Sequence, residues 1–195
     1  MQISIVIFDD FTDLDLFLPW DLLNRVSWDS VGKSKDWKVE IIGTKTSHIS
    51  MSGLEIPTSG TLDKIPHSDV VIFTSGTGVS KLLNNEEYLN TIKLDVEKQL
   101  IGAMCSGTLL LGALGLLQNK TATTYPTRMK DLSKYGAIPV NKSFVVNQNI
   151  ATAASCMAAT ELVNWIIKEK AGQEMVEKVM NSVEPISSTN KITSF

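Results

Sequence analysis

The stretch Leu100–Leu117, LIGAMCSGTLLLGALGLL, decides the fold of this chain. An apolar run typical of a buried strand ends at Cys105, and a leucine-rich segment with small residues, typical of a helix, follows directly. Where a strand turns sharply into a helix, the residue at the turn projects its side chain above the sheet. The backbone N–H of the next residue is then free to help bind an oxyanion. The pattern predicts a nucleophile elbow with Cys105 as the candidate nucleophile.

The start of a helix is a favourable place for a nucleophilic cysteine. An ordinary thiol has a pKa of about 8.5 and is mostly protonated at neutral pH. Unpaired N–H groups and the helix dipole stabilise the thiolate and lower that pKa to about 3.5–7.5. Gly107 permits close backbone approach, and Ser106 supplies both the next N–H and a hydroxyl. The alternative is that Cys105 is a small buried side chain at the end of a strand.

Composition narrows the class of protein. The 195 residues, 43% hydrophobic and 20% charged, predict one domain over residues 1–195 with a substantial core. A net charge of -3 argues against a nucleic-acid partner or an anionic membrane surface, so we expect a small-molecule substrate. The start, MQISIVIFDD, has no basic leader, and the apolar run Leu109–Leu117 is shorter than the roughly 20 residues that span a bilayer. We expect a cytoplasmic protein with free thiols and no metal site.

β-Branched runs alternate with helical patterns along the chain, which indicates a parallel sheet covered by helices on both faces. The predicted strands are Gln2–Phe8, Trp37–Gly43, Val70–Thr74, Leu100–Met104 and Ala122–Thr124, with a late pair, Phe144–Val146 and Asn149–Ala153. The predicted helices are Asp13–Val26, Lys81–Lys98, Ser106–Leu117, Thr127–Lys134, Met157–Ala171 and Gln173–Ser182. The polar segment Ser187–Phe195 is expected to be a surface extension.

Ligands of open α/β sheets bind outside the carboxyl ends of the strands. Three polar or reactive segments are expected to meet there: DDFTDLDLFLPWDLL after the first strand, SGTGV after Val70–Thr74, and Cys105. The SGTG loop lacks the GxGxxG pattern of a dinucleotide site, so no nucleotide cofactor is predicted.

These segments resemble the ThiJ/PfpI superfamily, and within it the isonitrile (isocyanide) hydratase-like branch. The shared motifs are LDL at residues 14–16 with Pro19, GTGV at 76–79, the elbow CSGTLLLGALGLL, ATT at 122–124 and YGAIPV at 135–140. The resemblance implies a flavodoxin-like three-layer α/β sandwich with a mostly parallel sheet, as in class I glutamine amidotransferases. It also implies a homodimer and a reaction without a cofactor.

Carried over position by position, the resemblance makes Cys105 the nucleophile and Asp15 the acid/base residue. It places the backbone N–H groups of Gly76 and Ser106 at the oxyanion site, and Thr77 in the same loop becomes a candidate substrate-binding residue. A reaction through an anionic adduct needs a proton donor and later a group that activates water, and a buried carboxyl can do both. The alternative for Asp15 is an ordinary carboxylate at a helix start.

The chain departs from the family at several positions. Ser75-Gly76 stands where relatives often have two glycines, and Tyr125 follows ATT where many relatives place a histidine. His48 and His67 are interpreted as ordinary non-catalytic residues, which disfavours a mechanism based on a Cys–His dyad. Tyr125 either contacts substrate or packs.

The segment ATAASCM at 151–157 replaces the usual glycine-rich turn of the family. Cys156 is therefore a candidate pocket residue, with a core position as the alternative, and a redox function follows if it neighbours Cys105. Trp20 is a further candidate for lining a pocket.

The function expected from these residues is hydration of small apolar isonitriles to N-substituted formamides through a Cys105 thioimidate. One alternative is a redox-sensing or protective protein, since a low thiol pKa also favours oxidation. Another is a ligand-binding module, because similar domains occur as sensory halves of AraC-type regulators. A glyoxalase or deglycase is a weaker alternative because of Tyr125.

Overall fold

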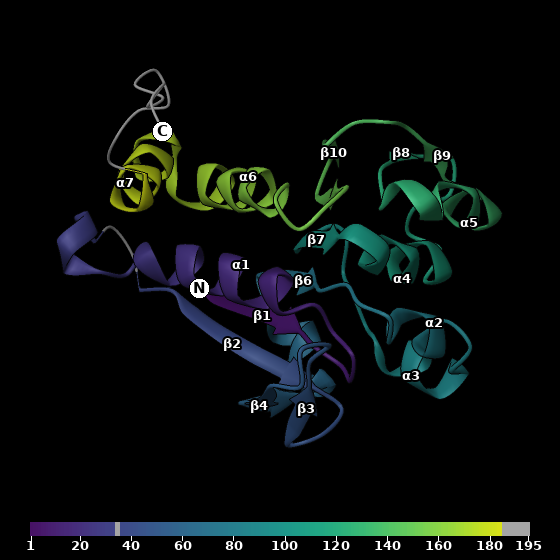
Figure 1. The fold of residues 1–195 in the computed structure, drawn as a ribbon. Coiled ribbons are helices and arrows are strands. Elements are labelled where there is room, and N and C mark those ends of the chain that lie inside the picture. The colour runs from purple at the N-terminus through teal and green to yellow at the C-terminus, as the bar shows by residue number, and fades with distance from the viewer. Residues whose placement is uncertain (34–35, 185–195) are drawn as a thin grey trace, which may run out of the picture.

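The computed structural model describes residues 1–33 and 36–184, and within them a seven-stranded sheet forms the centre of the molecule (Figure 1). The strand order is β10-β11-β7-β6-β1-β2-β5, and only β10, at one edge, runs antiparallel to its neighbour. The strands of this sheet are β1 (Gln2–Val6), β2 (Lys38–Gly43), β5 (Gly60–Thr61), β6 (Val70–Phe73), β7 (Leu100–Met104), β10 (Phe144–Asn147) and β11 (Ile150–Ala153).

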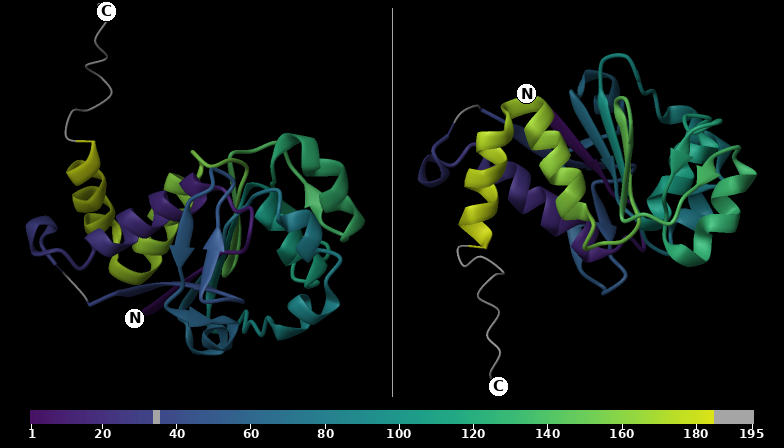
Figure 2. Two further views of the ribbon diagram at one scale, coloured as in Figure 1. Left: turned by 60° about the horizontal axis from the view of Figure 1, so that its bottom comes forward. Right: turned by 90° about the horizontal axis from the view of Figure 1, so that it is seen from above.

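Helices cover both faces of the sheet, as the view from above shows (Figure 2). One face carries α1 (Asp13–Arg25), α6 (Ala159–Ala171) and α7 (Gln173–Val183), which pack against one another. The other carries α2 (Val79–Leu82), α3 (Glu86–Thr91), α4 (Thr108–Ala113) and α5 (Met129–Lys134). The fold is the flavodoxin-like three-layer sandwich that the alternation of strands and helices predicts.

The central strands are apolar along their whole length because both of their faces are covered. Every residue of β6 and of β7 is buried. Their register pairs Val70 with Leu100 and Phe73 with Ala103, so the two strands end side by side. The loops that follow β1, β6 and β7 therefore meet at one edge of the sheet, as expected for parallel strands.

The predicted long helix Lys81–Lys98 is wrong. The chain forms α2 and α3 instead, and residues 92–99 are not helical. Asn85 interrupts the helix, because its extended backbone and its side-chain oxygen, which accepts the Tyr88 N–H at 3.0 Å, form the N-cap of α3.

Short elements account for the remaining differences. The sequence analysis missed the hairpin of β3 (Ser47–Ile49) and β4 (Glu55–Pro57), as well as β5 and β9 (Ile138–Pro139). The predicted strand Ala122–Thr124 shortens to β8 (Thr121–Ala122), which pairs with β9. Thr124 leaves the strand because its hydroxyl bonds to the Cys105 carbonyl. Such two- and three-residue strands have too few positions to show an alternating pattern.

The helix after Cys105 is also shorter than predicted. A 3₁₀ turn, Cys105–Gly107, precedes α4, and Gly115 with a φ of 76° lies just beyond the end of α4. The segment predicted as a surface extension, Ser187–Phe195, lies outside the described residues, so the prediction of one domain over residues 1–195 stays a prediction.

Candidate active site

Cys105 occupies the turn between β7 and α4 in the conformation of a nucleophile elbow. Its φ of 52° lies in the left-handed region, which costs a non-glycine residue about 1–3 kcal/mol. The Thr124 hydroxyl donates to the Cys105 carbonyl oxygen at 2.7 Å and so helps to hold this strained turn. The thiol is half-buried, and the Ser106 backbone N–H hydrogen-bonds it. Cys105 thus has the geometry that the sequence predicts for a nucleophile.

Two glycines allow the loops after β1, β6 and β7 to approach one another. A Cβ on Gly107 would lie 2.3 Å from the Thr74 carbonyl oxygen, so the elbow could not pack against the end of β6 with a larger residue. A Cβ on Gly76 would lie 2.0 Å from the Asp10 carbonyl oxygen, and Gly76 has a φ of 144°. Glycine is required at both positions because the backbones are in direct contact.

Asp15 lies in the first turn of α1 and is fully buried. Its Oδ2 accepts the Ser75 backbone N–H at 3.0 Å, while Oδ1 has no hydrogen bond of ordinary geometry within the described residues. Burial raises the pKa of Asp15, and the neighbouring Cys156 thiol and Ser75 oppose that shift. A carboxyl that is desolvated and incompletely hydrogen-bonded favours its neutral form, which is able to donate a proton.

Ser75 links Asp15 to Cys105 and was not identified as a site residue from the sequence. Its backbone N–H binds Asp15, and its hydroxyl hydrogen-bonds the Cys105 sulfur and lies 3.3 Å from the Thr12 hydroxyl. The signal was present in the sequence, because Ser75 replaces a glycine that is frequent in relatives. A polar side chain at that position has a role only when it is buried, as it is here.

Cys156 lies next to Cys105. Strand β11 pairs with β7 in parallel so that Ala153 is opposite Met104, and the two cysteines follow these strand ends. The Cys156 thiol hydrogen-bonds the Cys105 sulfur and also contacts Asp15. The structure thus brings together the two cysteines and Asp15, which are far apart in the sequence.

The surroundings of Cys105 favour its thiolate. The hydrogen bond from Cys156 is the main cause, and the Ser75 hydroxyl and the Ser106 N–H add to it. Burial and the negative charge of Asp15 act in the opposite direction. The net result lowers the pKa of Cys105 from 9.0 to about 7. The same contact with Cys105, together with burial and Asp15, raises the pKa of Cys156. At neutral pH Cys105 is therefore the nucleophilic member of the pair, and Cys156 is the proton donor.

A cavity of about 310 Å³ opens beside Cys105. The predicted residues Gly76, Thr77, Ser106 and Tyr125 line it. So do several residues that the sequence analysis did not single out: Thr12, Met51, Ser75, Ser80, Thr127 and Arg128. A larger cavity, about 640 Å³, lies beside α3, and the described residues that line it include no cysteine or histidine.

Unlike Tyr125 and Thr77, three other candidate residues are not among the residues that line the cavity: Trp20, Asp15 and Cys156. Trp20 is 38% exposed on α1 and is not among the described residues that line the cavity, so its place in a pocket stays a prediction. Asp15 and Cys156 are also outside the lining and lie behind Cys105, where they contact its thiol or act on its charge.

Gly76 and Ser106, whose backbone N–H groups are expected at an oxyanion site, both line the cavity. The Gly76 N–H donates to the Ser106 hydroxyl oxygen at 3.3 Å, and the Ser106 hydroxyl is also 3.3 Å from the Gly76 carbonyl. The Ser106 hydroxyl thus satisfies the Gly76 N–H through one long hydrogen bond. An anionic substrate atom is able to take the place of the hydroxyl as acceptor of that N–H.

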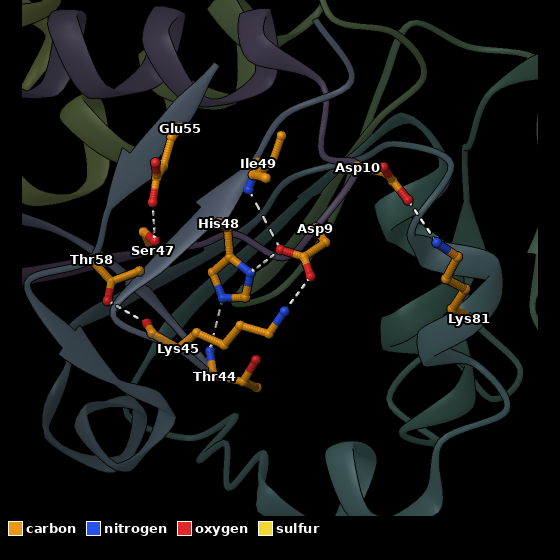
Figure 3. A network of polar contacts seen from close by, with 10 residues as sticks. All are labelled: Asp9, Asp10, Thr44, Lys45, Ser47, His48, Ile49, Glu55, Thr58 and Lys81. Atoms are coloured by element: carbon orange, nitrogen blue, oxygen red, sulfur yellow. Dashed lines mark hydrogen bonds and ion pairs between the residues drawn. The ribbon is translucent and has the colours of Figure 1, made fainter. Parts of the chain in front are cut away.

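His48, interpreted from the sequence as an ordinary non-catalytic residue, is buried and only 2% exposed. Figure 3 shows it among its polar partners. Its Nε2 accepts the Thr44 N–H at 3.1 Å, so its proton is on Nδ1, which lies 2.9 Å from Asp9 Oδ1. Lys45 also binds Asp9, and these two partners lower the pKa of Asp9 to about 2. His48 has no free nitrogen for a thiol, and its role is to fix the β3–β4 hairpin.

That hairpin carries one wall of the cavity. Met51 follows β3, and its N–H donates to the Phe11 carbonyl oxygen at 2.8 Å. Asp10, in the loop after β1, forms an ion pair with Lys81 at 2.8 Å (Figure 3). Asp9 and Asp10 therefore hold the loop after β1 through polar contacts. Asp13 lies in the first turn of α1 and accepts a hydrogen bond from the Ser52 hydroxyl.

No group of three or more histidine, cysteine, aspartate or glutamate side chains within residues 1–33 and 36–184 is arranged to hold a metal ion. In the same part of the chain, no helix has both the length and the apolar character that crossing a bilayer requires.

The fold and the site define a class: flavodoxin-like α/β proteins with a cysteine at a nucleophile elbow. The chain belongs to the DJ-1/PfpI family, whose pattern matches residues 1–169. It is 30% identical over 185 residues to an isonitrile hydratase of Pseudomonas putida, a match that covers 94% of this chain and 78% of that protein.

Solved structures confirm the fold. A ThiJ/PfpI family protein from Pseudomonas syringae superposes with a TM-score of 0.83 at 24% identity, covering 100% of this chain and 78% of that chain. DJ-1 of Schizosaccharomyces pombe superposes with a TM-score of 0.78 at 16% identity, covering 94% and 98%.

Proposed function

We propose that this chain is a cysteine-dependent hydratase that converts small isonitriles, R–NC, to N-substituted formamides. The observation that carries the proposal is the linked set of Cys105, Ser75 and Asp15 in a chain similar to an isonitrile hydratase. This set combines a thiol of lowered pKa with a buried carboxyl of raised pKa, which are the nucleophile and the acid that hydration needs.

In the first step the Cys105 thiolate attacks the terminal carbon of the isonitrile. A carbon–sulfur bond forms, and the proton of Asp15 goes to the same carbon, giving the thioimidate R–N=CH–S–Cys105. The Ser75 hydroxyl contacts both groups and provides a hydrogen-bonded route for this proton. Negative charge that develops during the attack is stabilised by the N–H groups of Gly76 and Ser106.

In the second step water adds to the thioimidate carbon. One water proton returns to Asp15, the other goes to nitrogen, and the carbon–sulfur bond breaks to release R–NH–CHO and the Cys105 thiolate. No external oxidant, reductant or cofactor is consumed. Since Asp15 loses and regains one proton in each cycle, a pKa raised by burial suits its role as proton donor in the first step.

The cavity favours a compact substrate. Hydroxyl-bearing residues form most of its lining, and Arg128 lies at its wall, 3.4 Å from the Ser80 hydroxyl and paired with Asp131 at 3.0 Å. Most of the surface that these residues expose to the cavity is nevertheless apolar, which suits the small apolar isonitriles expected from the sequence.

The test is formamide production from a simple alkyl or aryl isonitrile by the wild type, Cys105→Ser and Asp15→Asn, with enzyme-free controls. Turnover by the wild type and its loss in both variants is expected. His67→Ala, a change at an exposed position, is the matched control and retains full activity. Absence of wild-type turnover, while Cys105 still reacts rapidly with iodoacetamide, would overturn the proposal.

A second function is favoured by one observation. The contact between the Cys105 and Cys156 thiols supports a redox-sensing or protective role. It is distinguished from hydration by stoichiometric reaction with peroxide in the absence of any turnover of isonitriles.

A further inference from the structure

Cys156 forms no bond to substrate in the proposed hydration, yet the fold places it against the nucleophile, whose pKa it helps to lower. Strands β7 and β11 are parallel neighbours whose last paired residues are Met104 and Ala153. Adjacent strands are about 4.8 Å apart, so the segments that follow them begin side by side. Cys105 follows one strand directly, and Cys156 is the third residue after the other.

The two sulfur atoms meet and remain accessible. Their thiols interact closely enough to shift each other's pKa, neither is in a disulfide, and both residues are only half-buried. Residues 154–158, which carry Cys156, form bends and a turn between β11 and α6 rather than regular structure. A short irregular segment is able to move by the small distance that separates a thiol–thiol contact from a disulfide bond.

We propose that Cys156 is the resolving thiol of Cys105, so that a hydroperoxide converts the two residues to an intramolecular disulfide. This proposal goes beyond isonitrile hydration and does not depend on it. It assigns a reversible oxidative modification to a residue that otherwise acts only on the pKa of its neighbour.

The reaction takes place in two balanced steps. The Cys105 thiolate attacks one peroxide oxygen, the O–O bond breaks, and the leaving hydroxide or alkoxide takes a proton, which leaves Cys105 as a sulfenic acid. The Cys156 sulfur then attacks the Cys105 sulfur, a disulfide forms, and water leaves with the Cys156 proton. The peroxide is reduced, and the two thiols are oxidised by two electrons.

The polarity of the pair suits these roles. Cys105 has the lowered pKa and is the thiol that meets the peroxide, while Cys156 stays protonated until the sulfenic acid forms. Disulfide formation removes the nucleophile from the cavity and protects it from irreversible oxidation to the sulfinic acid. A dithiol reductant restores both thiols.

The test treats the reduced protein with an equimolar amount of hydrogen peroxide and records intact mass under non-reducing conditions, with thiol titration before and after dithiothreitol. The wild type is expected to become two hydrogen atoms lighter, to lose both thiols and to regain both with dithiothreitol. Cys156→Ser is expected to gain one or two oxygen atoms and to lose the reversible step. Cys156→Ala provides a second variant, and circular dichroism verifies that both variants fold.

Because a change at Cys156 also alters the reactivity of Cys105, the proteins are compared at times when equal fractions of Cys105 have reacted. Peptide mapping identifies the joined residues. Oxygen adducts on wild-type Cys105 with Cys156 still a free thiol would overturn the proposal, and so would a disulfide between two chains. Neither outcome requires isonitrile turnover, so failure of this proposal is distinct from failure of the proposed function.

Discussion

The pKa of Cys105 depends mainly on one neighbour, so replacing Cys156 with alanine tests the site directly. In the wild type a pKa of about 7 makes about half of Cys105 thiolate at pH 7, whereas a pKa of 9.0 leaves about 1%. A thiolate whose pKa is lower by two units is also a weaker nucleophile, by about eightfold. Net alkylation of Cys105 by iodoacetamide at pH 7 is therefore about sixfold faster than for a thiol with the higher pKa.

The variant Cys156→Ala loses the hydrogen bond that contributes most to this effect, while burial and the charge of Asp15 continue to raise the pKa. The alkylation midpoint should move from about 7 towards 9.0, with a slower rate at pH 7 and a faster plateau in alkali. The assay is the pH profile of alkylation, with peptide mapping to separate the two cysteines.

Cys156→Ser supplies the matched control, because a serine hydroxyl still donates a hydrogen bond to the thiolate. Its midpoint should stay closer to that of the wild type than to that of Cys156→Ala. If Cys156→Ala leaves the midpoint unchanged, the hydrogen bond is not the cause of the lowered pKa and the reasoning is refuted.

Three further predictions concern stability. Burial raises the pKa of Asp15 in the folded protein, so the protonated carboxyl favours folding; this contribution is fully present below the unfolded value of 3.8 and is lost as the pH rises through the raised pKa. The unfolding free energy of Asp15→Asn relative to the wild type should thus increase as the pH rises from 3.8 through the raised pKa in urea titrations, and a constant difference would contradict the raised pKa. Gly76→Ala should lower the free energy of unfolding by about 3 kcal/mol or more, because its Cβ meets a backbone carbonyl oxygen at 2.0 Å. Gly115→Ala is the control: its Cβ meets nothing within 4 Å, so it should cost only about 1–2 kcal/mol. Equal losses of stability in thermal melts would exclude the close contact at Gly76. Thr124→Val should cost about 1–3 kcal/mol and slow alkylation of the elbow cysteine, because it leaves the elbow carbonyl without its hydroxyl donor; an unchanged melting temperature would argue against that role.

Long, regular elements were predictable because their patterns are local. Continuous or periodic hydrophobicity predicts the strands β1, β6 and β7 and the helix from Asp13, and the structure confirms them. The helix predicted over Lys81–Lys98 was wrong because a single side chain, Asn85, caps a new helix within it. The β3–β4 hairpin was missed because its strands are three residues long and its anchor is tertiary: a buried His48 hydrogen-bonded to Asp9.

The sequence by itself determined the class of fold and placed the cysteine at the elbow, since both follow from local order: an apolar strand, Cys105, and a helix that begins at once. The family match and the superpositions confirm the fold. Tertiary structure alone decided which groups surround that thiol. Asp15, Ser75 and Cys156 come from three separate segments, the first turn of α1 and the stretches after β6 and β11, and only the parallel register of the strands brings them together. Their pKa values follow from this proximity and from burial, which no pattern along the chain records.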